Sequence, residues 1–266
     1  MTITTTVSRT VLVTGALGGI GQAICIAMAR QGHSIILHDR LDSNDSTVLS
    51  FHAKLEELGA ARVTYRRADL SLVDEIDAMF DDLVDHGFSI DILVNNAAIQ
   101  HTAPIEAFPL DTWSNILAIN LTAVYRCMQR SIPLMRQSGW GRIVSIASVH
   151  GLVGSIHKAA YVAAKHGLVG LTKVTALETA EQNITVNAIC PGWTDTPLLG
   201  PQIEARQRQL ESTREAAIYD LVREKQPSGR LIDPVQVAGL VEYLVSDMAQ
   251  SMTGTALPID GGWTCQ

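Results

Sequence analysis

The stretch VLVTGALGGIGQAI, residues 11–24, joins a run of apolar and β-branched residues to a helical pattern through four glycines. Glycine permits a tight turn and a close approach of the backbone to a phosphate group. The free N–H groups and the dipole at the start of a helix favour an anion at the same place. A glycine cluster alone is weak evidence, but here it has the flanking strand and helix that such a motif requires. The stretch therefore predicts a cofactor-binding turn, and an ordinary structural turn is the alternative.

Short strand-like runs alternate with longer helical patterns along the rest of the chain. The expected strands are 11–14, 34–39, 63–67, 91–95, 142–146, 184–189 and 255–260, and the expected helices include 20–29, 73–84, 113–135, 161–180 and 235–245. Such alternation implies right-handed βαβ crossovers and a parallel sheet with helices on both faces. We therefore expect an α/β, Rossmann-like fold with a doubly wound parallel sheet.

The domain organisation follows from the same pattern, because no internal repeat and no linker rich in Pro, Gly or Ser interrupts it. We expect residues 1–266 to form a single domain, in which 10–100 mainly binds the cofactor and 100–266 forms the catalytic and substrate half. Residues 196–225 are more polar than their surroundings. We expect them to form a helical insertion at the edge of the sheet, either a lid or a plain pair of surface helices.

Composition and charge exclude several classes of protein. The net charge of -7 argues against nucleic-acid binding. No apolar run reaches the length of about 18 residues that a membrane helix needs, and the polar start of the chain lacks the apolar core of a signal peptide. We therefore expect a soluble, cytoplasmic protein. The four cysteines are widely scattered, so neither a disulfide framework nor a metal site is expected.

The cofactor half carries two carboxylates after strand-like runs. Asp39 ends the second run, where a carboxylate can accept hydrogen bonds from the adenosine ribose and would repel a 2′-phosphate. Asp39 therefore favours NAD over NADP, although the neighbouring Arg40 is of a type that can hold a 2′-phosphate. Asp69, which precedes Leu70, could accept a bond from the adenine amino group, or it could cap the helix that follows.

A second stretch, SIASVHGLVGSIHKAAYVAAKHG at residues 145–167, places ionisable groups in a segment that otherwise looks buried. Tyr161 and Lys165 are four residues apart, so they share one helix face. A nearby ammonium favours the phenolate and lowers the pKa of a tyrosine, which could then act as a general base. Ser148, at the end of the preceding strand, could orient a substrate oxygen. Alone, this spacing more often marks a surface pair.

Together these motifs resemble the short-chain dehydrogenase/reductase family over essentially the whole chain. The resemblance rests on TGALGGIG at 14–21, NNAA at 95–98, Asn120, Ser148, Tyr161 with Lys165, and Pro191 with Gly192. It implies hydride transfer with Tyr161 as acid/base, Ser148 on the substrate oxygen, Lys165 on the nicotinamide ribose, and Asn120 holding a water of the proton relay. The expected cofactor contacts are Gly15, Leu17, Gly19, Ile20, Gly21, Asp39, Asp69, Leu70, Asn96, Tyr161, Lys165, Pro191 and Thr194. Ala98 departs from the glycine usual in the family.

The expected catalytic and cofactor-binding residues leave Lys158 without a role. A lysine near a helix start is unfavourable for the helix dipole, so we expect it to hold an anionic substrate. The runs IQH, SVHGLV, KAAYVAAKHG, CPGW, EKQPS and DGGW, which begin at 99, 148, 158, 190, 224 and 260, resemble bacterial D-3-hydroxybutyrate dehydrogenases. This resemblance implies a homotetramer that oxidises D-3-hydroxybutyrate to acetoacetate with NAD. The substrate contacts it implies are Gln100, Ser148, His150, Lys158, Tyr161, Trp193, Gln202 and Trp263.

Other interpretations of these residues remain open at this stage. Lys158 could be a solvated lysine, His150 a paired loop histidine and Gln202 an ordinary surface residue. A reductase of 3-oxoacyl thioesters would share the fold, but it would typically prefer NADPH and would need no carboxylate clamp. A non-catalytic dinucleotide sensor would keep the glycine turn without needing the catalytic residues.

Overall fold

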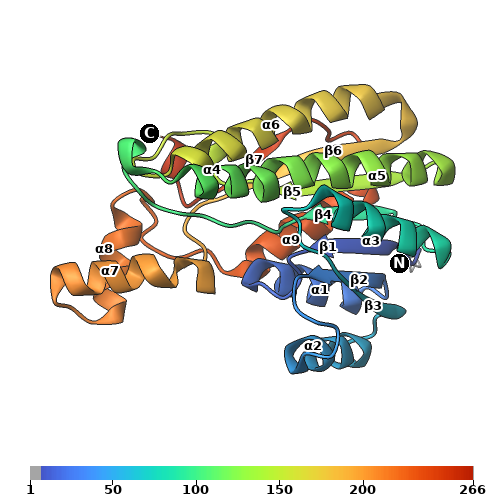
Figure 1. Cartoon of the computed structure of the whole chain (residues 1–266), viewed down its shortest axis with the longest axis horizontal. Coiled ribbons are helices and arrows are strands. Elements are labelled where there is room, and N and C mark those ends of the chain that lie inside the picture. The colour runs from blue at the N-terminus through green and yellow to red at the C-terminus, as the bar shows by residue number, and fades with distance from the viewer. Residues whose placement is uncertain (1–6, 266) are drawn as a thin grey trace.

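The computed structural model describes residues 7–265, which form one parallel sheet covered by helices on both faces (Figure 1). The sheet has seven strands in the order β3-β2-β1-β4-β5-β6-β7. The strands are β1 (Thr10–Thr14), β2 (Ser34–Asp39), β3 (Arg62–Arg67), β4 (Ile92–Asn95), β5 (Gly141–Ile146), β6 (Ile184–Pro191) and β7 (Ala256–Ile259). All neighbouring strands pair in parallel. The predicted α/β doubly wound fold is therefore confirmed.

The helices divide between the two faces of the sheet. They are α1 (Gly19–Arg30), α2 (Ser46–Glu57), α3 (Val73–Asp85), α4 (Leu110–Leu117), α5 (Ala123–Ser138), α6 (Ala159–Thr179), α7 (Gly200–Leu210), α8 (Arg214–Arg223) and α9 (Pro234–Val245). One core contains buried residues of α1, α2 and α9, and the other contains those of α3, α5 and α6. Strand β1 contributes side chains to both cores, because successive side chains of a strand point to opposite faces. Val11 and Val13 enter the first core, while Leu12 enters the second.

Two features of the helices differ from the expected pattern. Helix α2 is absent from the expected helices; it begins after Asp45, whose side chain accepts from the backbone N–H of Thr47. The single helical pattern expected at 113–135 is divided by a π-helical segment, Ala118–Thr122, between α4 and α5. Such segments insert a residue into the helix and often occur at functional sites.

The insertion at 196–225 forms α7 and α8, which lie at one end of the molecule (orange in Figure 1). The two helices pack on each other around a small cluster of their own, formed by Leu199, Ile203, Ala217 and Leu221. This cluster is separate from the two cores of the sheet. The insertion is therefore a helical unit that is joined to the sheet without sharing its core.

The order of the strands fixes where a ligand can lie. The chain moves outward from β1 to β3 on one side and then returns to β4 on the other side of β1. In an open parallel sheet, this switch point leaves a crevice at the carboxyl ends of the strands, and ligands bind there. Of residues 7–265, no helix is long and apolar enough to cross a membrane. The prediction made for the polar start of the chain falls largely on residues 1–6, outside the described residues.

Candidate active site

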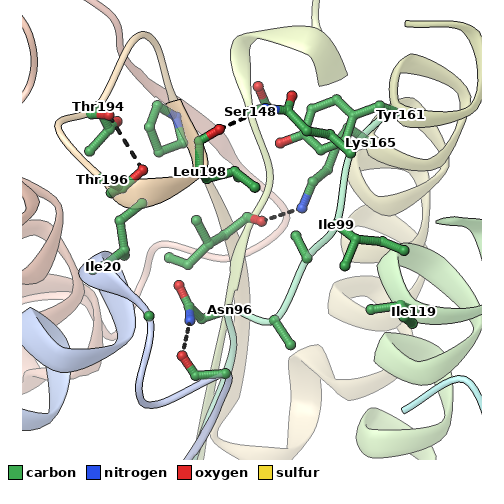
Figure 2. Close-up of a pocket in the computed structure, with 18 of the residues that line it drawn as sticks. Ile20, Asn96, Ile99, Ile119, Ser148, Tyr161, Lys165, Thr194, Thr196 and Leu198 are labelled. Atoms are coloured by element: carbon green, nitrogen blue, oxygen red, sulfur yellow. Dashed lines mark hydrogen bonds between the residues drawn. The ribbon is translucent and has the colours of Figure 1, made fainter. Parts of the chain in front are cut away.

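A cleft of about 530 Å³ opens at the carboxyl ends of the central strands. Its walls come from the glycine turn, the loops after β2 to β6, the start of α6 and the first part of the 196–225 insertion. Figure 2 shows Ile20 and Thr196 on one side of the cleft and Tyr161 and Lys165 on the other. The two stretches that the sequence singled out therefore meet in one cleft.

The glycine turn is shaped by close backbone contacts. Gly15 has a φ of +62°, in the left-handed region that favours glycine. A Cβ at Gly21 would lie 2.2 Å from the backbone oxygen of Gly15, which no ordinary packing permits. Helix α1 begins at Gly19, with no side-chain cap at Gly18 and no acidic residue in its first turn. The positive end of α1 is thus left free for an anion.

The NNAA loop supports this turn from β4. The Asn96 Nδ2 donates to the backbone oxygens of Thr14, at 3.0 Å, and Gly15, at 2.9 Å. The hydroxyl oxygen of Thr14 in turn accepts from the backbone N–H groups of Asn96 and Ala97. Ala98, the residue that departs from the family pattern, lines the cleft beside this loop.

The carboxylate of Asp39 is at the cleft and is held by the backbone. Its Oδ2 accepts from the N–H of Leu17 at 3.2 Å, and its Oδ1 accepts from the N–H of Arg40 at 2.8 Å. Asp69 also lines the cleft, where its Oδ1 accepts from the N–H and the hydroxyl of Ser71. These bonds hold the pKa of Asp69 below its usual value. Helix α3 has Leu72 as its N-cap, so Asp69 does not cap it.

Helix α6 and the end of β5 bring the expected catalytic residues together. Lys165 is buried, and its Nζ donates to the backbone oxygen of Ile146 at 2.7 Å. The same Nζ lies 5.6 Å from the ring centroid of Tyr161. Burial lowers the pKa of Lys165 to about 8. The hydroxyl oxygen of Ser148 accepts from the N–H of His150 at 3.2 Å, so Ser148 uses its hydroxyl hydrogen for the hydrogen bond with Tyr161.

The pKa of Tyr161 differs in direction from the sequence-based expectation. Burial raises this pKa to about 12, and a hydrogen bond with Ser148 lowers it only in part. The expectation assumed that the ammonium of Lys165 would dominate. In the structure Tyr161 is 8% exposed, and Lys165 directs its ammonium to the Ile146 oxygen. The cost of burying a phenolate therefore outweighs the attraction of the neighbouring charge.

Asn120 lies within the π-helical segment and is fully buried. Its Oδ1 accepts from the N–H of Ile99 at 2.9 Å, and its Nδ2 donates to the Ile99 oxygen at 2.8 Å. The side chain therefore supports the loop that leads to Gln100, and it does not line the cleft. The predicted contact of Asn120 with a water of a proton relay stays a prediction, because the amide retains one lone pair and one N–H beyond its two bonds to Ile99.

Lys158 places a buried positive charge in the cleft. It is 6% exposed, and its Nζ lies 3.1 Å from Gln202 Oε1, 3.5 Å from Gln100 Oε1 and 5.0 Å from the centroid of the Trp193 ring. Within residues 7–265, no carboxylate forms an ion pair with it. Burial lowers the pKa of Lys158 to about 8. A buried ammonium without a counter-ion costs free energy that a bound anion would recover.

An aromatic cluster stands next to Lys158. The ring of His150 meets those of Tyr161 and Trp263 edge to face, at centroid distances of 6.0 and 5.4 Å, and the rings of Trp193 and Trp263 lie 5.5 Å apart. The His150 Nδ1 and the Trp193 Nε1 are buried without a hydrogen-bond partner among the described residues. Burial lowers the pKa of His150 to about 3, so its ring is neutral. All four rings of this cluster line the cleft.

Most of the predicted residues line this cleft, and the exceptions are Leu17, Gly21 and Asn120, which shape its walls from behind. Several lining residues were not anticipated: His38, Asn115, Ile119, Thr196 and Leu198. Thr196 packs so closely on Gly19 that a Cβ there would lie 2.9 Å from the Thr196 Cγ2. A glycine at position 19 thus indicates a close neighbour, but the sequence alone does not identify that neighbour as Thr196.

A cleft that runs from a glycine turn to a buried tyrosine and lysine on one helix is typical of dinucleotide-dependent oxidoreductases with a parallel sheet. The family profile described as enoyl-(acyl carrier protein) reductase matches residues 15–264. The chain belongs to the short-chain dehydrogenase/reductase family and is an oxidoreductase.

Three relatives illustrate what the chain is similar to. It is 46% identical to a D-beta-hydroxybutyrate dehydrogenase of Cupriavidus necator, with 97% of this chain and 98% of that protein covered. It is 41% identical to a protein of the same name from Rhizobium meliloti, with 97% and 100% covered. It also resembles the crystal structure of an actinorhodin polyketide ketoreductase with NADPH at 34% identity and a TM-score of 0.88, with 96% of this chain and 97% of that chain covered.

Proposed function

We propose that the protein catalyses the reversible, NAD-dependent oxidation of D-3-hydroxybutyrate to acetoacetate. The observation that carries this proposal is the ammonium of Lys158, which is buried in the cleft without a carboxylate partner among residues 7–265. A short anionic substrate would supply the missing charge. The likeness to two D-beta-hydroxybutyrate dehydrogenases supports the same substrate class.

The carboxylate end of the substrate would lie against Lys158 and His150. The neutral His150 ring has one N–H that can donate and a buried Nδ1 that lacks a partner. The amide oxygens of Gln100 and Gln202 face Lys158. A carboxylate accepts hydrogen bonds only, so it would take the place of the Gln202 oxygen on the ammonium. Gln202 could then turn its amide and donate to the same carboxylate.

The reacting end of the substrate would lie between Ser148 and Tyr161. Ser148 would donate a hydrogen bond to the C3 oxygen, and Tyr161 would take the proton of the C3 hydroxyl during oxidation and return it during reduction. NAD, when bound, would supply the hydride acceptor. Burial raises the pKa of Tyr161, and the Lys165 ammonium, 5.6 Å from the centroid of the Tyr161 ring, would favour the phenolate that accepts this proton.

The cofactor assignment rests on how the described residues fit a dinucleotide. The uncapped start of α1 suits a pyrophosphate, and the Asp39 carboxylate suits the hydroxyls of an adenosine ribose. Each Asp39 oxygen already accepts one N–H, and each retains a further lone pair for a ribose hydroxyl. These features support NAD over NADP. We further propose that the protein is a homotetramer, as the resemblance to this subfamily implies.

The 196–225 insertion would act as the lid of this site. It carries Gln202, and its Leu198 backbone oxygen accepts from the Gln100 Nε2 at 3.3 Å. The separate apolar cluster of α7 and α8 would let the two helices move together, and closure would exclude water from the reacting atoms.

A reduction of 3-oxoacyl thioesters is the nearest competing function, and the likeness to a ketoreductase with NADPH favours it. Such a substrate presents no carboxylate at the clamp. It would leave the Lys158 ammonium buried without a counter-ion. The 2′-phosphate of NADPH would in addition be repelled by Asp39.

The decisive experiment mixes the purified protein with D-3-hydroxybutyrate and NAD and follows the absorbance of NADH. The L enantiomer, the methyl ester of the D acid, and NADP are the comparisons. We expect fast NADH formation with the D acid and NAD alone. Equal rates with the methyl ester would remove the carboxylate clamp, and faster rates with NADP would overturn the cofactor assignment.

A further inference from the structure

His38 is a buried histidine that the proposed mechanism does not use. It occupies the position before Asp39 at the end of β2, is 2% exposed and lines the cofactor side of the cleft. Ile36, two residues earlier on the same face of the strand, lies in an apolar core. An imidazole that continues this apolar face costs free energy unless both its nitrogens find partners.

Both nitrogens of His38 do find partners, and the partners follow the two strands that flank β2, which are β1 and β3. The Nε2 lies 3.1 Å from the backbone oxygen of Ala68, after β3. The Nδ1 accepts from the backbone N–H of Gly15, the first glycine of the turn, at 3.5 Å. Ala68 can only accept at its oxygen, so Nε2 carries the proton and Nδ1 has the lone pair. A single neutral tautomer therefore satisfies both contacts, and burial lowers the pKa of His38 in favour of that neutral form.

Gly15 is consequently held by a side chain at each of its polar groups. Asn96, in the loop after β4, donates to the Gly15 oxygen at 2.9 Å, and His38, at the end of β2, accepts from the Gly15 nitrogen. Ala68 precedes Asp69, whose carboxylate lines the cleft. The imidazole thus fixes the distance between the turn that would hold the pyrophosphate and the loop that would face the adenine.

We propose that His38 is a positioning residue for the adenosine half of the dinucleotide, acting through Gly15 and Ala68. The proposal rests on the dinucleotide site of the proposed function and not on the choice of hydroxy acid. Its prediction is specific: loss of the imidazole weakens every ligand that spans the turn and the adenine loop, and it leaves the chemistry at Tyr161 unchanged.

His33 provides a matched control within the same strand region. It lies at the opposite end of β2, is 3% exposed and accepts from the backbone N–H of Arg9 through its Nδ1 at 3.2 Å. Replacing His33 removes the same kind of contact at the amino-terminal end of β2, which does not face the cleft. A change that reflects general stability affects both variants, whereas a change in positioning affects only His38.

The experiment compares His38→Phe and His33→Phe by titration with NADH, followed by its fluorescence, and with ADP-ribose, followed by calorimetry. We expect the Kd of both ligands to rise about tenfold in His38→Phe, as the loss of one or two backbone hydrogen bonds implies, and to stay unchanged in His33→Phe. The kcat at saturating NAD and hydroxy acid should remain that of the parent. An unchanged Kd in His38→Phe, or an equal rise in both variants, would overturn the proposal.

Two further variants guard against a misfolded His38→Phe. His38→Asn can keep an acceptor near the Nδ1 position, and His38→Gln can keep a donor near the Nε2 position. Each should recover part of the affinity for ADP-ribose, and failure of both, in folded protein, contradicts the assignment. If the parent binds NADPH better than NADH, the NAD clause of the proposed function fails, and the same titrations with NADPH still decide the role of His38.

Discussion

Lys158 Nζ lies 3.1 Å from Gln202 Oε1, so a neutral amide from the 196–225 insertion contacts a buried ammonium without supplying a counter-charge. The contact joins the start of α6 to α7. It also means that a substrate carboxylate competes with an oxygen of the protein itself for the same charge. The free energy of substrate binding is therefore the difference between a charge-assisted contact and the amide contact that it replaces.

Replacement of Gln202 by glutamate tests this competition. In Gln202→Glu the new carboxylate would stay on Lys158, and we expect the KM for D-3-hydroxybutyrate to rise about 10–100-fold, as a hydrogen bond to a charged group implies. Gln202→Ala, the control, loses a donor but adds no competing charge, so its KM should rise less. Steady-state kinetics of both variants provide the measurement, and equal KM values would show that the acidic side chain does not reach the ammonium.

The affinity of the clamp should depend on pH. Burial lowers the pKa of Lys158 to about 8, so the ammonium is present below that pH and is lost as the pH rises through it. Butyrate, which has the carboxylate but no reacting hydroxyl, isolates this step from the proton transfer at Tyr161. Its Ki should be constant below pH 8 and should then rise about tenfold per unit of pH. In Lys158→Met the Ki should be high and independent of pH.

The acid/base role of Tyr161 has a direct test. Tyr161→Phe keeps the ring that packs against His150 and removes the hydroxyl, so the fold and the KM for the hydroxy acid should change little. We expect kcat to fall by about 10²–10⁴-fold, the usual contribution of a general acid or base. A Tyr161→Phe variant that turns over as fast as the parent would refute the assignment. Tyr125→Phe, on the exposed part of α5, is the matched control.

The choice of cofactor should depend on the Asp39 carboxylate. Asp39→Asn keeps an oxygen that can accept from the Leu17 N–H and removes the charge that would repel a 2′-phosphate. We expect the ratio of NADPH to NADH affinity to rise by about tenfold or more, with Arg40 available beside the phosphate. Fluorescence titration with both cofactors measures the ratio. No change would mean that Asp39 acts only as a support of the turn.

The sequence predicted the strands well because buried parallel strands are short runs of apolar residues with few alternatives. All seven strands lie within two residues of the predicted ranges, and β2 coincides with its range. Helix α2 was not among the expected helices, and its N-cap Asp45 is followed by the polar residues Ser46 and Thr47. The π-helical segment was not expected either, since a single inserted residue hardly changes the apolar pattern between Trp113 and Met135.

The candidate site could be predicted where its residues lie close together in the sequence, on one element. Tyr161 and Lys165 are four residues apart on one helix, so their proximity follows from the sequence. The contacts between distant segments were not predictable. The sequence could propose Gln100, Lys158 and Gln202 only through a resemblance, and it could not show which amide atoms face the ammonium. The direction of the Tyr161 pKa also depends on burial, which is a property of the whole fold.

Asn120 and Asn187 allow structural support to be separated from support of the site. Both are fully buried, and both amides pair with the backbone: Asn120 with Ile99, and Asn187 with Met252 and Thr255. Replacement of either by alanine leaves two backbone groups unpaired, so we expect a loss of unfolding free energy of about 2–4 kcal/mol in each variant.

The two variants should differ in function, because only Ile99 leads directly into the cleft through Gln100. Asn120→Ala should raise the KM for the hydroxy acid at temperatures where the protein remains folded, and Asn187→Ala should not. Denaturant unfolding measures the first quantity and steady-state kinetics the second. Equal kinetic effects would assign both residues to general stability alone, whereas a selective fall of kcat in Asn120→Ala, without a change in KM, would favour a contact of Asn120 with the proton relay.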